Sequence, residues 1–232
     1  MTDSKTREKL MDWAVEYNDP VYFEEDPIAF PRKLAKEGKS LKDIEIAAVF
    51  AAHFAWGRRA MIVRDCNRLF EHMDWSPWDY VREGEWKSSN ESIHRTVKWS
   101  EVAAICARLK DFYSRHESLE ELDAQQFRCL IYGQKPDPKA ANKKINMLRR
   151  WMVRDDGKVD LGLWKHSSKS ELIVPLDVHV YTQACDLGLS SRKAKDLLTA
   201  QEITNCFKEI WPDDPLLGDF ALFGYGVSQK NA

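Results

Sequence analysis

Two residues with complementary chemistry stand at the expected starts of two helices: Lys143 and Asp177. Asp177 follows Pro175, and apolar residues at helical spacing come after it. Lys143 and Lys144 lie in the first turns of a basic amphipathic segment, where the helix dipole disfavours a cation. An amine can attack a sugar carbon and form a Schiff base, and a carboxylate can stabilise an oxocarbenium-like state. Together the two groups predict cleavage of an N-glycosidic bond.

Each residue also has an ordinary structural explanation. A carboxylate such as Asp177 is a favourable N-cap, because it accepts backbone N–H bonds at a helix start. Lys143 and Lys144 also fit an exposed lysine pair. The catalytic interpretation requires that two side chains far apart in the sequence converge on one opening.

The elements that must position this pair are helical almost throughout. Apolar residues recur at helical spacing in most segments, and residues 172–176 are the only short extended candidate. Ser40, with Asp43 three residues later, caps an apolar helix that we expect at the centre of the core. The main predicted helices span residues 5–17, 41–55, 58–73, 100–113, 118–130, 139–154, 181–189, 200–211 and 214–227. The sequence therefore predicts an all-α fold with short connections.

Composition narrows the class of protein. The chain has 232 residues, 44% of them hydrophobic, which is enough for one large domain or two small ones. It lacks an apolar run long enough for a transmembrane helix, and its first residues lack an apolar signal core. Its five cysteines are scattered, with no CxxC pair. We therefore expect a cytoplasmic monomer with reduced thiols, no membrane partner, and no metal or other cofactor.

Charge is unevenly distributed along the chain. The net charge of −2 does not suggest a nucleic-acid-binding protein, but residues 135–169 contain ten basic and four acidic residues. Such an excess suits a phosphate-facing surface if the residues share a face, and it also suits a solvated helix face. The basic residues that we consider as nucleic-acid contacts here are Lys139, Lys144, Arg150 and Arg154.

Two further segments combine aromatic or histidine side chains with arginine. Trp56 precedes Arg58 and Arg59, a pattern that can stack on a base and contact a phosphate. A buried tryptophan beside surface arginines would give the same pattern. His94 and Arg95 lie in a polar loop before a helix, where they fit either an anion site or a surface ion pair.

Three stretches resemble the helix-hairpin-helix superfamily of DNA base-excision glycosylases, which includes endonuclease III, adenine glycosylase and 8-oxoguanine glycosylase. Residues 47–59 match the family's buried helix, and residues 143–154 match its helix that opens with a lysine after the hairpin. Residues 175–189 begin Pro-Leu-Asp-Val-His, close to the Pro-Val-Asp-Val-His of 8-oxoguanine glycosylases. In addition to these three, residues 219–224 resemble the family's last core helix.

The resemblance implies two helical lobes with a cleft between them, formed by residues 41–130 and by residues 1–40 plus 131–232. It implies that Lys143 is the Schiff-base nucleophile and that Asp177 is the oxocarbenium stabiliser and proton acceptor. The substrate would be a damaged base flipped out of duplex DNA. The protein would thus be a DNA glycosylase with AP-lyase activity.

The same resemblance implies a base pocket. Met147, one turn after the lysine, would line the pocket, and Phe220 or Phe223 would face it; plain core packing is the alternative. His179 would orient the carboxylate or contact a phosphate, or would be an ordinary helix histidine. His53 lies where the family has a Gln- or Asn-rich loop that enters the DNA.

More closely, the chain resembles an uncharacterised bacterial and archaeal family, which supplies no activity. The shared segments are residues 54–57, 94–96, 150–154, 175–177 and 219–224.

Two other functions stay open. The superfamily's hairpin carries Gly-x-Gly before the lysine, whereas residues 137–142 contain no glycine, and the net charge is close to zero. Both features favour a catalytically inactive nucleic-acid-binding protein of the same fold. The remaining alternative is an enzyme that acts on a nucleoside or on RNA.

Overall fold

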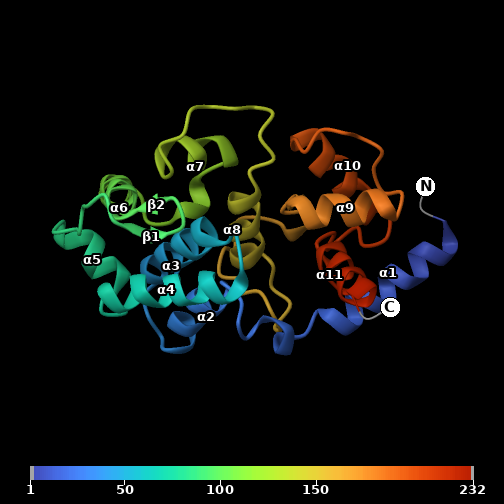
Figure 1. Cartoon of the computed structure of the whole chain (residues 1–232), viewed down its shortest axis with the longest axis horizontal. Coiled ribbons are helices and arrows are strands. Elements are labelled where there is room, and N and C mark those ends of the chain that lie inside the picture. Colours follow the sequence, from blue (N-terminus) through green and yellow to red (C-terminus); the bar gives the residue numbers. More distant parts are fainter. Residues whose placement is uncertain (1–2, 231–232) are drawn as a thin grey trace. The chain divides into compact units, whose positions relative to one another are not determined.

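The structure of the protein is a computed structural model that describes residues 3–230 (Figure 1). Within those residues the chain forms eleven α-helices and one short two-stranded hairpin, so the predicted helical fold is confirmed. The chain divides into two compact units. The first unit takes the chain up to Tyr22 and again from Asp137 onward, and the second unit is Phe23–Pro136. Residues 23–40 therefore belong with the central segment of the chain rather than with its ends.

The second unit is built around α3 (Leu41–Phe54). The Asp43 backbone N–H donates to Ser40 Oγ at 3.2 Å, which is the predicted N-cap, and every residue from Asp43 to Phe54 is buried. Three helices pack against α3: α2 (Ala29–Lys36), α4 (Arg59–His72) and α5 (Pro77–Glu83). The remaining elements of this unit are β1 (Ser92–His94), β2 (Val97–Lys98), α6 (Trp99–Tyr113) and α7 (Ala124–Leu130).

Two elements of the second unit have no counterpart in the sequence-based prediction, α2 and the β1–β2 hairpin. The antiparallel strands are three and two residues long, too short to show the alternation that predicts a strand. The Arg68 guanidinium supports the hairpin by donating to the carbonyls of Ser92 and Ile93 at 2.8 and 2.7 Å. Conversely, residues 172–176 form no strand.

The first unit joins the two ends of the chain. In it, α1 (Ser4–Tyr17) packs along α11 (Leu217–Lys230), and α11 also contacts α9 (Val178–Asp186) and α10 (Leu197–Lys208) (Figure 1). The basic helix, α8 (Lys143–Val153), begins four residues later than predicted. The residues before it form a loop, in which the Lys139 carbonyl accepts a hydrogen bond from the Leu197 N–H at 2.8 Å.

None of the helices between residues 3 and 230 combines the length and the apolar character that crossing a membrane requires.

Gly218 allows α10 and α11 to approach each other closely. A Cβ atom at Gly218 would lie 2.2 Å from the ring of the buried Phe207. We predict that Gly218→Ala lowers the free energy of unfolding by about 1–3 kcal/mol, because the ring has no room to move aside. Helix propensity alone predicts the opposite sign, a gain of about 1 kcal/mol. Chemical denaturation distinguishes these two expectations. A Gly218→Ala variant that is more stable than the natural chain would contradict the close contact between Gly218 and Phe207.

Candidate active site

Lys143 and Asp177 come together in the first unit. Lys143 Nζ lies 3.9 Å from Asp177 Oδ2, and the two side chains are 30% and 35% exposed. The other carboxylate oxygen, Oδ1, accepts a hydrogen bond from the Val180 N–H at 2.9 Å and so caps α9. Asp177 is therefore both the N-cap and the ion-pair partner of Lys143, because its two oxygens serve different groups.

The chain leading into each helix determines where these groups lie. Asp177 has an extended backbone with φ −112° and ψ −172°, as is typical of an N-cap residue, and α9 starts directly after it. Asn142 has a left-handed backbone with φ 47°, which asparagine tolerates better than most residues. The resulting turn places Lys143 at the first position of α8.

Lys143 is the first of four residues along one face of α8. Spacings of four, three and four residues place Lys143, Met147, Arg150 and Arg154 on that face, with Arg154 at the end of the helix. Each of the three cations faces at least one carboxylate. We call this set the α8 ion-pair ladder; its members are Lys143, Arg150, Arg154, Asp156, Asp160, Asp177, Asp214 and Asp219.

The ladder is buried at its arginine end. Arg150 Nη1 lies 2.5 Å from Asp219 Oδ2, and Arg150 Nε lies 3.3 Å from Asp160 Oδ1. Arg154 Nη1 lies 3.0 Å from Asp160 Oδ2, and Arg154 Nε lies 2.9 Å from Asp214 Oδ1. The two arginine side chains are only 8% and 1% exposed, so the Lys143–Asp177 contact is the solvent-accessible end of the ladder.

Burial also raises the pKa values of two aspartates inside the ladder. It raises the pKa of Asp160 despite the two neighbouring guanidinium groups. It likewise raises the pKa of Asp219; Arg150 and Lys143 oppose this shift, and the Asp177 carboxylate adds to it. Asp219 is therefore within electrostatic reach of the Lys143–Asp177 pair.

Three of the residues predicted for the site in this unit are buried. Arg150 and Arg154 were expected to contact nucleic acid, but both are buried and bound to carboxylates. Their guanidinium carbons lie 4.9 and 4.8 Å from the centre of the Phe220 ring, which is itself 1% exposed. Phe220 is therefore core packing beneath the ladder and not the wall of an open base pocket.

The other predicted residues of the first unit are spread around the ladder. Met147 is half-buried on the ladder face of α8, and His179 is exposed in the first turn of α9. Phe223 packs against two tyrosines of the N-terminal segment, with ring centres 5.7 and 6.1 Å apart. Lys139 is exposed in the loop before α8, and Lys144 is half-buried. Of this group, Met147 lies on the same face as the candidate amine.

In the second unit, the two predicted histidine contacts are buried. His53 Nε2 lies 2.9 Å from Glu101 Oε1. His94 Nδ1 lies 2.7 Å from Asp65 Oδ2, and its Nε2 lies 3.0 Å from the Trp56 carbonyl oxygen. The expectation that His53 and His94 touch nucleic acid is corrected, because both rings are committed to internal contacts.

Trp56 and Arg95 form an exposed cation–π contact in the second unit. The Arg95 guanidinium carbon lies 4.2 Å from the centre of the Trp56 ring, which is 39% exposed. Gly57, at φ +111°, leaves room for this stacking, since a Cβ there would lie 2.6 Å from Arg95 Nη1. Arg58 and Arg59 are exposed beside it. We call Trp56, Arg58, Arg59 and Arg95 the Trp56 surface.

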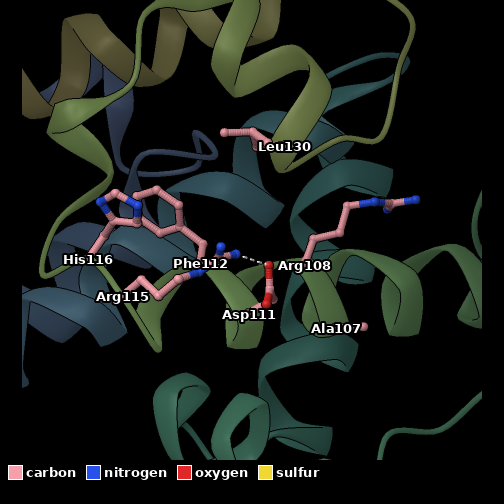
Figure 2. A pocket seen from close by; sticks show the side chains of 7 residues that line it. All are labelled: Ala107, Arg108, Asp111, Phe112, Arg115, His116 and Leu130. Carbon is pink, nitrogen blue, oxygen red and sulfur yellow. Dashed lines mark hydrogen bonds and ion pairs between the residues drawn. The ribbon is translucent and has the colours of Figure 1, made fainter.

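Two cavities lie elsewhere in the chain. The first, of about 330 Å³, lies where α6 and α7 meet, and in its wall Phe112 stacks on His116 with ring centres 4.4 Å apart (Figure 2). The second, of about 520 Å³, lies between α9 and α10 and is lined in part by Cys185 and Cys206. Neither contains a residue that the sequence predicted for the site. Among residues 3–230, no group of three or more His, Cys, Asp or Glu side chains could hold a metal ion.

The buried arginine of the ladder provides a test of this arrangement. We predict that Arg154→Met lowers the free energy of unfolding by about 3–5 kcal/mol, because three carboxylates then lose their shared cation. The matched control is Lys165→Met, which removes an exposed cation 2.8 Å from Asp155 and should change stability by less than about 1 kcal/mol. Thermal and chemical denaturation measure the stability of both variants. If Arg154→Met and Lys165→Met lower the free energy of unfolding equally, Arg154 is not the shared cation of a buried ladder.

Comparison with known proteins places the chain in a family without assigning it a reaction. No curated protein and no solved structure matches it. One family model, described as "Protein of unknown function (DUF2400)", matches residues 26–134 and 124–228. These matches span most of the chain and both compact units. The chain therefore belongs to this family.

Proposed function

We propose that the protein is a DNA base-excision glycosylase with AP-lyase activity, in which Lys143 is the nucleophile and Asp177 is its acid–base partner. The observation that supports this most is the distance of 3.9 Å between an amine and a carboxylate that both remain partly exposed. A reaction needs groups that substrate can reach, and the other ion pairs of the ladder are closed by burial.

The proposed reaction needs only these two side chains. Asp177 takes a proton from Lys143, and the free amine attacks C1′ of the deoxyribose. The bond from C1′ to the base breaks with its electron pair on the base nitrogen. The base takes up the second proton of the Lys143 nitrogen, which is positively charged after the attack. Ring opening then returns the proton of Asp177 to the sugar oxygen and leaves a protonated Schiff base between Nζ and C1′. Once it has given up this proton, the ionised Asp177 carboxylate can stabilise the positively charged Schiff base.

The rest of the ladder suits this chemistry because it restrains the nucleophile. Lys143 is the first residue of a helix whose later residues, Arg150 and Arg154, are clamped by buried carboxylates. Asp177 is tied to α9 by its own capping bond. Both reacting groups are thus attached to ordered elements, which keeps the cost of aligning them low.

The partner that we propose is duplex DNA carrying a flipped, damaged base. The Trp56 surface supports a nucleic-acid partner, because an exposed aromatic ring can stack on a base while neighbouring arginines meet phosphates. Lys139 is a further exposed cation in the first unit.

Borohydride trapping on duplexes with an abasic site or 8-oxoguanine tests the reaction. Borohydride reduces a Schiff base to a stable amine, so we predict a covalent protein–DNA adduct with the natural chain. Lys143→Ala should abolish it, and Asp177→Asn should slow its formation on the order of 100-fold. Lys165→Ala, which removes an exposed lysine of the same unit that has no predicted role in binding, is the matched control and should keep the adduct. The lyase assignment fails if the natural chain gives no adduct or if Lys143→Ala gives as much.

A nucleic-acid-binding protein without catalysis is the second candidate function. It is favoured by the ladder itself, since the Lys143–Asp177 contact continues a series of ion pairs whose other members are structural. The loop of residues 137–142 also contains no glycine to bring its backbone close to a phosphate. This candidate predicts that the Asp177→Asn variant still binds nucleic acid and that neither it nor the natural chain releases a base. The remaining alternative, an enzyme that acts on a nucleoside or on RNA, is tested by the same adduct assay with those substrates.

The Trp56 surface predicts how binding responds to substitution. Trp56→Ala should weaken duplex binding about 5- to 150-fold, because one stacked base is worth about 1–3 kcal/mol. Arg95→Ala should weaken binding and reduce its dependence on salt by about one phosphate contact. Arg115→Ala, which removes an exposed arginine elsewhere in the same unit, is the control and should leave both unchanged. Fluorescence anisotropy at several salt concentrations measures the affinity and its salt dependence. If the three variants bind the duplex equally well, the Trp56 surface does not contact the DNA.

A further inference from the structure

We propose that the segment of residues 190–195 is a phosphate-binding surface, on which Lys193 and Lys195 hold the backbone of the DNA strand beside Asp177. We call this segment the basic loop. The inference rests on the proposed function, because it places the DNA strand on the unit that carries the Lys143–Asp177 pair. Lys193 and Lys195 were not among the residues that the sequence predicted for the site.

The basic loop connects α9 to α10, and both helices fix its backbone. The Tyr181 hydroxyl, on α9, donates to the Arg192 carbonyl at 2.7 Å. The Thr199 hydroxyl, on α10, donates to the Ala194 carbonyl at 2.6 Å. A ligand that binds this loop does not have to order its backbone first, which lowers the entropic cost of binding.

The two lysines of the basic loop are available to a ligand. Both are exposed, and among residues 3–230 neither forms an ion pair with a carboxylate. Lys195 Nζ lies 5.0 Å from the centre of the Tyr181 ring, which places this cation above α9.

The carboxylates of Glu202 and Asp196 also contact the basic loop, but other residues of the loop bind them. Ser190 Oγ donates to Glu202 Oε2 at 2.6 Å, and Arg192 Nη2 lies 3.0 Å from Asp196 Oδ2. The charges of the two lysines are therefore left for a group outside the protein. Exposed cations that share a surface attract a polyanion.

The position of the basic loop favours the DNA backbone as this polyanion. Tyr181 lies one helical turn after Asp177, and its N–H donates to the Asp177 carbonyl at 3.0 Å. One turn advances about 5.4 Å along the helix axis, and the phosphates of one DNA strand follow each other about every 3.4 Å along the duplex. A strand whose sugar is bound at Asp177 therefore has its neighbouring phosphates within reach of the loop.

Two further features extend this surface. The cavity of about 520 Å³ between α9 and α10 is lined by Tyr181, Ser191 and Lys193, among others, so the surface is hollowed beside the loop. The Leu197 N–H, at the start of α10, donates to the Lys139 carbonyl at 2.8 Å. The loop before α8, with its exposed Lys139, thus adjoins the basic loop.

The double variant Lys193→Ala/Lys195→Ala tests the surface by fluorescence anisotropy. The probe is a duplex with a tetrahydrofuran abasic analogue, which cannot form a Schiff base, at several salt concentrations. We expect the affinity to fall about tenfold near 0.1 M salt and the slope of log affinity against log salt to fall by about two, because two phosphate contacts are lost. Lys5→Ala/Lys9→Ala removes two exposed lysines of α1 in the same unit, and this matched control should change neither quantity.

Acetylation of the natural chain gives a second measurement, which needs no variant. We expect the duplex to slow acetylation of Lys193 and Lys195, but not of Lys5 and Lys9, as followed by peptide mass spectrometry. Equal protection by inorganic phosphate at the same phosphate concentration would overturn the proposal, because the loop would then be a site for the free ion.

The failure of this surface and the failure of the proposed function give different results. Unchanged affinity and salt dependence in the double variant would overturn the surface, and the glycosylase assignment would stand if the natural chain still forms the borohydride adduct. Weakened binding by the double variant of a protein that forms no adduct would keep the surface and reject the glycosylase chemistry.

Discussion

The first unit depends on how one helix neutralises its cations. α8 carries three basic side chains on one face, and two of them are almost fully buried. Buried guanidinium groups are tolerated only when carboxylates surround them. The segment after α8, the segment before α11 and α11 itself must therefore bring aspartates to that face. Asp160 meets both arginines, and Asp214 and Asp219 come from the end of the chain. This pairing aligns parts of the unit that are distant in sequence.

The same constraint creates the candidate site at its open end. Moving along the face from Arg154 to Lys143, the cations become more exposed, and the last contact lengthens to 3.9 Å. A pair in this position combines two properties that rarely occur together: its backbone is fixed by the buried contacts, and its reacting atoms can be reached from solvent. The proposed catalytic pair and a purely structural ion pair would consist of the same residues, and only a chemical test distinguishes them.

The sequence predicted the parts that local rules determine. Asp177 follows a proline and precedes an apolar helical pattern, so the N-cap could be predicted from neighbouring residues, and the Ser40 cap of α3 likewise. The meeting of Lys143 with Asp177 was proposed from chemistry and resemblance, not from spacing. The burial of Arg150 and Arg154 could not be predicted, because the same helical spacing fits a solvated face and a face covered by aspartates. For the same reason the sequence does not single out Asp219 as a partner of Arg150, although Asp219 lies in one of the shared segments. The β1–β2 hairpin is too short to produce a periodic signal.

The proposed function requires that bonds are made at the exposed end of the ladder. The most direct measurement is to reduce a reaction mixture of the natural chain with an abasic duplex, digest it, and locate the sugar remnant by mass spectrometry. We expect the remnant to be attached to Lys143. A remnant on Lys144, on Lys139 or on the N-terminal amine would contradict this expectation, because none of these is the amine of the Lys143–Asp177 pair.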